Sequence, residues 1–376
     1  MNKAVKEVED FLYFLKFSVT SRIFTNFRGG PAVKNLFILL FILVTTYCIL
    51  ILVKLVETFS DKEIEFRNKM YMIVISQGVT LMLLKNLSSV PYVFNFDRLL
   101  KWIRKLHTVK DNNEMIQEII NENLAIVMKY SKIMFWVHLV LFIFSGITVT
   151  ALFYMQNVVI IIIPYLKAND HPYIYVIIQG ICCTGTGVWI VLTNTSNFDF
   201  GLYLIFFARI INKMIHCISD QDKREKCPDL LFRIIKKHLE LINMFSDFNG
   251  TVKFLSLIQL IFTTILFIFI LMCIQVYRDE YTMYLFFITV QLELFVLSVF
   301  GEYIRSETEQ IFNNLYQTTW YDLSLKDQKA ILFMMTISKK PLGLKAAGLY
   351  DISIMAFVQI LKASITYSAI ILTFTE

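Results

Sequence analysis

Three charged side chains stand inside otherwise apolar stretches of the chain, namely Lys85, Glu293 and Lys362. An ionised group in hydrocarbon is costly, so such residues tend to mark ion paths, ligand sites or buried ion pairs. Lys85 and Lys362 lie toward one end of their stretches, where a long side chain can reach water, and we expect both to do so. Glu293 lies near the middle of its stretch and is expected either to pair with a neighbouring helix or to face a wet cavity.

The residue types that carry out catalysis or bind metals are scattered. The five histidines and six cysteines show no metal-ligand spacing. The sequence also has no phosphate-binding loop, no nucleophile elbow and no Cys-His cluster. We therefore expect no enzyme, no cofactor and no metal site, and nothing in the pattern favours nucleic acid as a partner.

Seven long apolar stretches must position these residues. Hydrophobic residues make up 56% of the 376 residues and charged residues 18%, which is more apolar than a soluble domain requires. A helix needs about 20 apolar residues to cross a bilayer core of about 30 Å, and lipid offers the backbone no hydrogen-bond partner. The sequence predicts an all-α membrane protein in contact with lipid, with transmembrane helices near 35–54, 70–94, 132–156, 173–194, 254–277, 281–303 and 351–374.

The basic residues are distributed unequally between the two sides of these helices. Of the 36 lysines and arginines, 28 fall on the side of the N-terminus and six on the other side. Because positively charged loops stay in the cytoplasm, we expect a cytoplasmic N-terminus and an extracellular C-terminus. The expected parts are a cytoplasmic segment over 1–34, spans 1–6 with helical cytoplasmic extensions over 35–303, a cytoplasmic anchor over 304–350 and a seventh span over 351–376.

The outer ends of the spans carry aromatic and aliphatic residues with a few hydroxyl and amide groups. Such a lining is typical of a buried pocket for a small ligand. The same residues are also common where helices simply pack on one another, and this alternative stays open. The candidate ligand-binding residues are Tyr71, Val74, Ile75, Gly78, Gly146, Val149, Thr150, Phe153, Tyr175, Gln179, Cys182, Tyr281, Tyr284 and Phe287.

The last 60 residues carry the most specific pattern. It consists of Tyr316 followed by Trp320 and Tyr321, a Lys-Pro-Leu turn at Pro341, and a closing Thr366-Tyr367 with an aliphatic tail. In these elements the chain resembles the insect odorant receptor family. The resemblance is strongest over residues 310–374. Upstream it depends on length, on the number of spans and on the inverted topology.

The resemblance implies a ligand-gated cation channel built as a tetramer of an odour-tuned subunit and a shared co-receptor. It also implies a volatile, apolar or aromatic ligand among the outer halves of spans 2–6. By the same resemblance, span 7 lines the pore, with Thr366, Ile370, Thr373 and Phe374 at or near the gate. A short extra helix at 330–338 and the residues Tyr316, Trp320, Tyr321 and Pro341 would then belong to the subunit anchor.

We interpret the chain as an odour-tuned subunit in the plasma membrane of sensory neurons. The co-receptor of the family carries a long insertion in the connection between spans 4 and 5, which this chain lacks. Two alternatives stay open. One is a gustatory-type channel that works as a homomer, and the other is a seven-helix G-protein-coupled receptor, which would need the opposite orientation.

Overall fold

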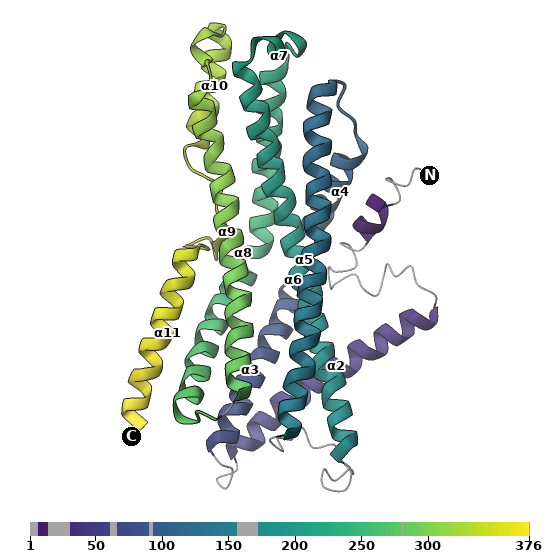
Figure 1. Cartoon of the computed structure of the whole chain (residues 1–376), viewed down its shortest axis with the longest axis vertical. Helices are drawn as coiled ribbons and strands as arrows, with labels where there is room; N and C mark the ends of the chain where they lie inside the picture. The colour runs from purple at the N-terminus through teal and green to yellow at the C-terminus, as the bar shows by residue number, and fades with distance from the viewer. Residues whose placement is uncertain are drawn as a thin grey trace.

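The computed structural model describes residues 7–13, 31–60, 66–89, 93–155, 172–279 and 281–375. They form an elongated bundle in which the long helices run side by side (Figure 1). After a short helix over residues 7–13, the principal helices are α2 Pro31–Ser60, α3 Phe66–Ser89, α4 Val93–Thr108, α5 Glu114–Met155, α6 Pro172–His216, α7 Gln221–Lys226, α8 Leu230–Val276, α9 Tyr281–Gln317, α10 Leu325–Ser338 and α11 Ile354–Thr375.

Each of the seven predicted spans overlaps a helix over most of its length, although span 2, predicted to end at 94, stops at Ser89 with α3, and the prediction of a seven-span all-α membrane protein is confirmed. Spans 1, 2 and 7 correspond to α2, α3 and α11, and the other four are parts of α5, α6, α8 and α9. Judged by length and composition alone, six helices of the described residues could cross a membrane. Helix α3 is more polar than the other spans, since its sequence includes Ser76, Gln77, Thr80 and Lys85. Much of α3 packs inside the bundle, so lipid does not demand a uniformly apolar surface from it.

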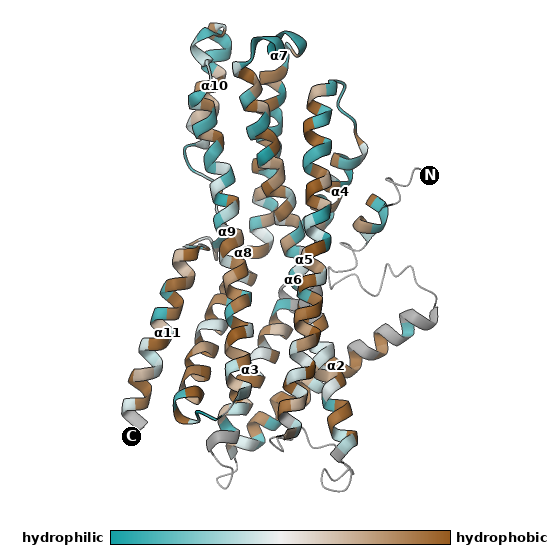
Figure 2. Ribbon diagram, viewed as in Figure 1, coloured by the Kyte–Doolittle hydropathy of each residue, from teal (hydrophilic) through white to brown (hydrophobic). Residues whose placement is uncertain are grey.

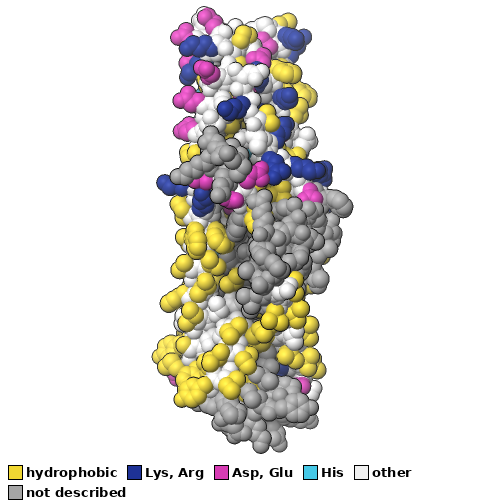
Figure 3. All heavy atoms as spheres, turned by 90° about the vertical axis from the view of Figure 1, so that its right-hand side faces the viewer, with side chains coloured by type: hydrophobic (Ala, Val, Ile, Leu, Met, Phe, Trp, Pro, Cys, Tyr) yellow, Lys and Arg dark blue, Asp and Glu magenta, His cyan; other side chains and the backbone are white. Residues whose placement is uncertain are grey.

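The four longest helices extend well beyond a bilayer. Helix α6 has 45 residues and α8 has 47, so each is about 70 Å long at 1.5 Å per residue. The half of the bundle that carries α7 and α10, here called the polar end, mixes hydrophilic and hydrophobic residues, whereas the other half is mainly hydrophobic (Figure 2). Charged side chains gather over the polar end, and hydrophobic side chains cover much of the opposite half (Figure 3).

The polar end has a core of its own. Phe200, Tyr203, Phe207 and Phe248 are almost fully buried there, together with residues of α4, α5 and α9. The second half of α6 lies at the centre of this core, which explains why it is apolar. Hydropathy alone would read Asn197–Ser219 as a span.

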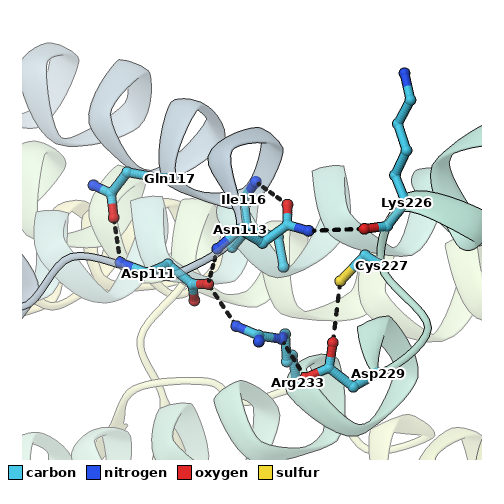
Figure 4. Close-up of polar contacts among 8 residues, drawn as sticks. All are labelled: Asp111, Asn113, Ile116, Gln117, Lys226, Cys227, Asp229 and Arg233. Carbon is cyan, nitrogen blue, oxygen red and sulfur yellow. Dashed lines mark hydrogen bonds and ion pairs between the residues drawn. The ribbon is translucent and has the colours of Figure 1, made fainter.

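A network of polar contacts holds the tip of the polar end together (Figure 4). Arg233 of α8 forms ion pairs with Asp229 and with Asp111 of the α4–α5 loop. The Asn113 side chain donates to the Lys226 carbonyl oxygen at 3.2 Å and accepts from the Ile116 N–H at 3.3 Å, so it also caps the start of α5. The network ties the connection before α5 to the junction between α7 and α8.

The C-terminal part departs from the predicted boundaries. The extra helix expected at 330–338 begins at Leu325, because the Ser324 hydroxyl accepts from the Asp327 N–H and caps it. The apolar run on which the prediction rested does not include this capping sequence. A two-stranded hairpin, β1 Lys345–Ala346 and β2 Tyr350–Asp351, follows α10 and turns at Ala347 and Gly348, both with positive φ. This hairpin was not predicted.

Gly301 lets α9 approach the segment that leads into α11. A Cβ atom at this position would lie 2.3 Å from the backbone oxygen of Ile352. Gly301→Ala is therefore expected to lower the free energy of unfolding by about 1–3 kcal/mol, the usual cost of overpacking. Thermal unfolding of the purified chain measures this. Gly343→Ala is the matched control, because its Cβ would meet nothing within 4 Å. Equal melting temperatures for the two variants would contradict the close approach.

Candidate ligand site

A cavity of about 200 Å³ lies in the hydrophobic half of the bundle, between α2, α3, α5, α6, α8 and α9. We call it the central cavity. For comparison, an engineered apolar cavity of about 150 Å³ is large enough to bind benzene. The lining is mostly aliphatic and consists of Tyr47, Ile51, Val74, Ile75, Gly78, Val79, Leu81, Met82, Lys85, Phe142, Ser145, Gly146, Val149, Cys183, Thr186, Gly187, Ile190, Thr263, Leu266, Ile270, Phe286, Thr289, Val290 and Glu293.

Two charged side chains form one wall of the central cavity. Lys85 of α3 pairs with Glu293 of α9, and the Lys85 ammonium also donates to the Asn194 side-chain oxygen of α6 at 3.3 Å. The side-chain amides of Asn194 and Gln259 donate to Glu293 Oε1 at 3.0 and 3.3 Å. These four residues, the polar cluster, join helices α3, α6, α8 and α9, and two of them, Lys85 and Glu293, also line the cavity.

The expectation that Lys85 reaches water is wrong. The residue is only 3% exposed, and its ammonium lies against the Glu293 carboxylate. Pairing removes the need to reach the bilayer surface, because opposite charges inside a protein stabilise each other strongly once both are desolvated. Both expectations for Glu293 hold, because its carboxylate pairs with Lys85 of a neighbouring helix and also lines the cavity. Lys362 is exposed, as expected.

Several hydroxyl groups add polarity to the cavity wall. The Thr186 and Thr289 hydroxyls donate to the carbonyl oxygens of Cys182 and Leu285 in their own helices, at 2.7 and 2.8 Å. Because each hydroxyl has a single proton, these threonines offer only acceptor lone pairs to a molecule in the cavity. A ligand with a hydroxyl group of its own therefore finds suitable partners.

The predicted ligand-binding residues divide into three groups. Val74, Ile75, Gly78, Gly146 and Val149 line the central cavity. Tyr175, Gln179 and Cys182 line a separate groove between α2 and α6. Tyr71 and Phe287 pack among the helices, the Thr150 hydroxyl donates to the Gly146 carbonyl oxygen at 2.8 Å, Tyr281 and Tyr284 are exposed, and the Phe153 side chain lies outside the described residues.

The central cavity lies deeper in the bundle than predicted. On α6 it is lined by residues from Cys183 to Ile190 and on α9 by residues from Phe286 to Glu293, whereas the predicted residues start two turns earlier at Tyr175 and about one turn earlier at Tyr281. The aromatic residues at the helix ends instead reach outward, and Tyr281 is 68% exposed. Tyrosine is enriched where a helix leaves the membrane, and these residues suit such an interfacial belt.

Sequence reasoning missed the contribution of α2. Tyr47 and Ile51 line the cavity, although span 1 carries no polar pattern that singles them out. It also missed Thr186, Thr289 and Lys85 as lining residues. The charges at positions 85 and 293 were the one available signal, because two buried ions of opposite sign in different spans can form a pair.

The predicted pore and anchor residues lie away from the cavity. On α11, Ser364 and Ser368 are buried, whereas Thr366, Ile370 and Thr373 lie on the exposed side, with Ile370 43% exposed. The Phe374 side chain lies outside the described residues. Near α10, Tyr316 and Tyr321 are exposed, Trp320 packs against Tyr321 and the core, and Pro341 is half-buried.

Solved structures share this fold over nearly the whole chain. The insect olfactory receptor OR5 from Machilis hrabei in complex with eugenol superposes with a TM-score of 0.76 at 10% identity, over 99% of this chain and 100% of that one. Another structure of the same receptor gives a TM-score of 0.77 at 11% identity, over 99% of both chains.

Curated relatives match part of the chain. Odorant receptor 67b of Drosophila melanogaster is 22% identical over 227 residues, which is 55% of this chain and 52% of the relative. Odorant receptor 49a of the same species is 23% identical over 194 residues, or 50% of this chain and 46% of the relative. The chain thus spans about half the length of these relatives. The family model described as 7tm Odorant receptor matches residues 63–365. This multi-pass membrane protein therefore belongs to the 7tm odorant receptor family.

Proposed function

We propose that the chain is the odorant-binding subunit of a ligand-gated, non-selective cation channel. The observation that carries the proposal is a largely aliphatic cavity at the meeting point of six helices in the hydrophobic half of a family member. Its volume, with a few hydroxyls and one ion pair, suits a small molecule better than a peptide or a sugar.

The ligand is a volatile of roughly the size of a substituted benzene. Its apolar body contacts Val74, Val149 and Val290, and one hydroxyl or phenol group donates to Thr186 or Thr289. The related receptor named above was solved with eugenol. The ligand-binding roles of Tyr71, Thr150, Phe153, Tyr281, Tyr284 and Phe287, which lie on the helices α3, α5 and α9 that form the cavity, stay predictions.

Channel opening is assigned to α11. One side of this helix packs on α8 and α9, and the other leaves Thr366, Ile370 and Thr373 uncovered in the single chain. In an assembly, a ring of Ile370 side chains would exclude water and ions until α11 moves outward. The ligand shifts this equilibrium only by binding the open form more tightly than the closed one.

The proposed partner is an odorant co-receptor, in a heterotetramer at the plasma membrane of sensory neurons. The polar end, with α10 and the residues Tyr316, Trp320, Tyr321 and Pro341, serves as the subunit anchor. Exposed aromatic and aliphatic side chains there, among them Phe333 and Leu332, give it the apolar surface that a permanent contact requires.

Recording currents with and without a co-receptor tests this proposal. Cells that express the chain with a co-receptor should conduct Na⁺ and K⁺ when phenols, alcohols and esters of benzene size are applied, and the chain alone should not. Equal currents from the chain alone would favour the gustatory-type homomer. A response that requires G proteins and carries no direct current would contradict the channel.

A further inference from the structure

A groove of about 300 Å³ lies between α2 and α6, beside the central cavity. Its rim is formed by apolar side chains such as Ile42, Leu43 and Ile178, all of which are exposed. In a membrane-spanning bundle, exposed aliphatic residues on two hydrophobic helices face lipid. The groove is therefore open to the bilayer.

The floor of this lateral groove is polar, unlike its rim. Gln179 lies on the floor at 8% exposure, and its side-chain Nε2 has no hydrogen-bond partner among the described residues. A buried amide donor without a partner costs about 1–3 kcal/mol. The Nε2 atom is itself covered, so a molecule in the groove that carries a carbonyl, ether or hydroxyl oxygen would accept this hydrogen bond once the Gln179 amide turns toward the groove.

The lateral groove and the central cavity meet at Tyr47. Tyr47 of α2 lines both spaces, and on α6 the neighbouring residues Cys182 and Cys183 line the groove and the cavity respectively. The Tyr47 hydroxyl meets the Cys183 sulfur at 3.6 Å, a contact between weak hydrogen-bonding groups. Rotation of the Tyr47 ring, which is buried at 7% exposure, would break only a weak hydrogen bond and would join the two spaces.

We propose that the lateral groove is the access route by which small apolar molecules with one oxygen acceptor pass from the bilayer into the central cavity. Gln179 holds the molecule at the floor of the groove, and Tyr47 is the movable partition. Apolar molecules concentrate in hydrocarbon rather than in water, so a route that starts in lipid draws on the larger pool. The route deepens the proposed function and rests on it for the identity of the natural ligand.

Labelling of Cys183 by N-ethylmaleimide, a small membrane-permeant molecule with carbonyl oxygens, tests the route in membranes that contain the full chain. Peptide fragmentation separates Cys182 from Cys183, so the rate at each thiol is measured directly. In the wild type, both should be modified. Ile178→Trp and Leu43→Trp fill the mouth of the groove and should slow modification of Cys183 by about tenfold, within the range over which access rates vary among related variants.

Val56→Trp is the matched control, because Val56 is an exposed residue of α2 that lines neither space. It should leave the Cys183 rate unchanged. Tyr47→Ala should raise that rate, and Tyr47→Phe, which keeps the ring and loses only the hydroxyl contact, should raise it less. If Tyr47→Ala does not reach the membrane, the tryptophan variants decide.

Equal Cys183 rates in Ile178→Trp, Leu43→Trp and Val56→Trp would overturn the route, and so would a Cys183 that is never modified in the wild type. The assay needs neither an identified odorant nor a co-receptor. A chain that labels as expected but never conducts would therefore reject the proposed function alone, and a conducting chain with unchanged labelling would reject the route alone.

Discussion

Glu293→Leu is expected to lower the free energy of unfolding by about 3–5 kcal/mol, because it leaves the buried Lys85 ammonium without its carboxylate. Asn194 would still accept one hydrogen bond from Lys85, but an amide oxygen does not neutralise a charge. Melting of the chain in detergent, followed by size-exclusion chromatography, measures the loss. Lys85→Met should lower the free energy of unfolding by a similar amount, since it leaves the buried Glu293 carboxylate without a positive charge beside it.

The double variant Lys85→Met/Glu293→Leu distinguishes the effect of the ion pair on stability from the effect of side-chain packing. Replacing both partners of a buried pair with apolar residues is often neutral or stabilising, so the double variant should melt above either single variant. Glu309→Leu, at an exposed position of the same helix, is the matched control and should stay within about 0.5 kcal/mol of the wild type. A double variant less stable than both single variants would show that these residues do not act as a pair.

Gly78→Leu is expected to raise the half-maximal ligand concentration by about 50- to 200-fold. Gly78 lines the central cavity, and a Cβ atom there would meet nothing within 4 Å, so a larger side chain at this position would start in open space and take up part of the cavity. It displaces three or four methylene-sized groups of the ligand, each worth about 0.8 kcal/mol. Concentration-response curves of cells that also express a co-receptor give the shift.

Gly78→Ala is the graded control for this prediction, because a single methyl group takes up little of the cavity and should shift the curve by only about fourfold. Ile370→Ala is expected to affect channel opening rather than ligand binding. It lies on α11, far from the cavity lining, and should raise the current without ligand. A Gly78→Leu curve that coincides with the wild type would place the ligand elsewhere.

The seven spans could be predicted from the sequence because the bilayer imposes a strict length and polarity on each helix. Two helices show the limit of the rule. Helix α3 is more polar than a lipid-facing span because it lies inside the bundle, and the second half of α6 is apolar because it forms the core of the polar end.

The candidate site could be predicted only in part. Spacing along a helix gives the face on which Gly78, Gly146 and Val149 lie, and these three do line the cavity. The depth of the cavity depends on how far apart the helices stand, which no single helix encodes. The sequence also predicted that the Lys85 side chain reaches water. This prediction failed because its partner Glu293 lies 208 residues away in the sequence, and the spacing along one helix does not reveal such a contact.

A density map of the chain in complex with a co-receptor and an activating volatile tests the central claim most directly. We predict ligand density in the central cavity, against Gly78 and Val149, with its polar group at Thr186 or Thr289. Density only at the helix ends, beside Tyr281 and Tyr284, or a cavity that stays empty at a saturating concentration, would contradict the account.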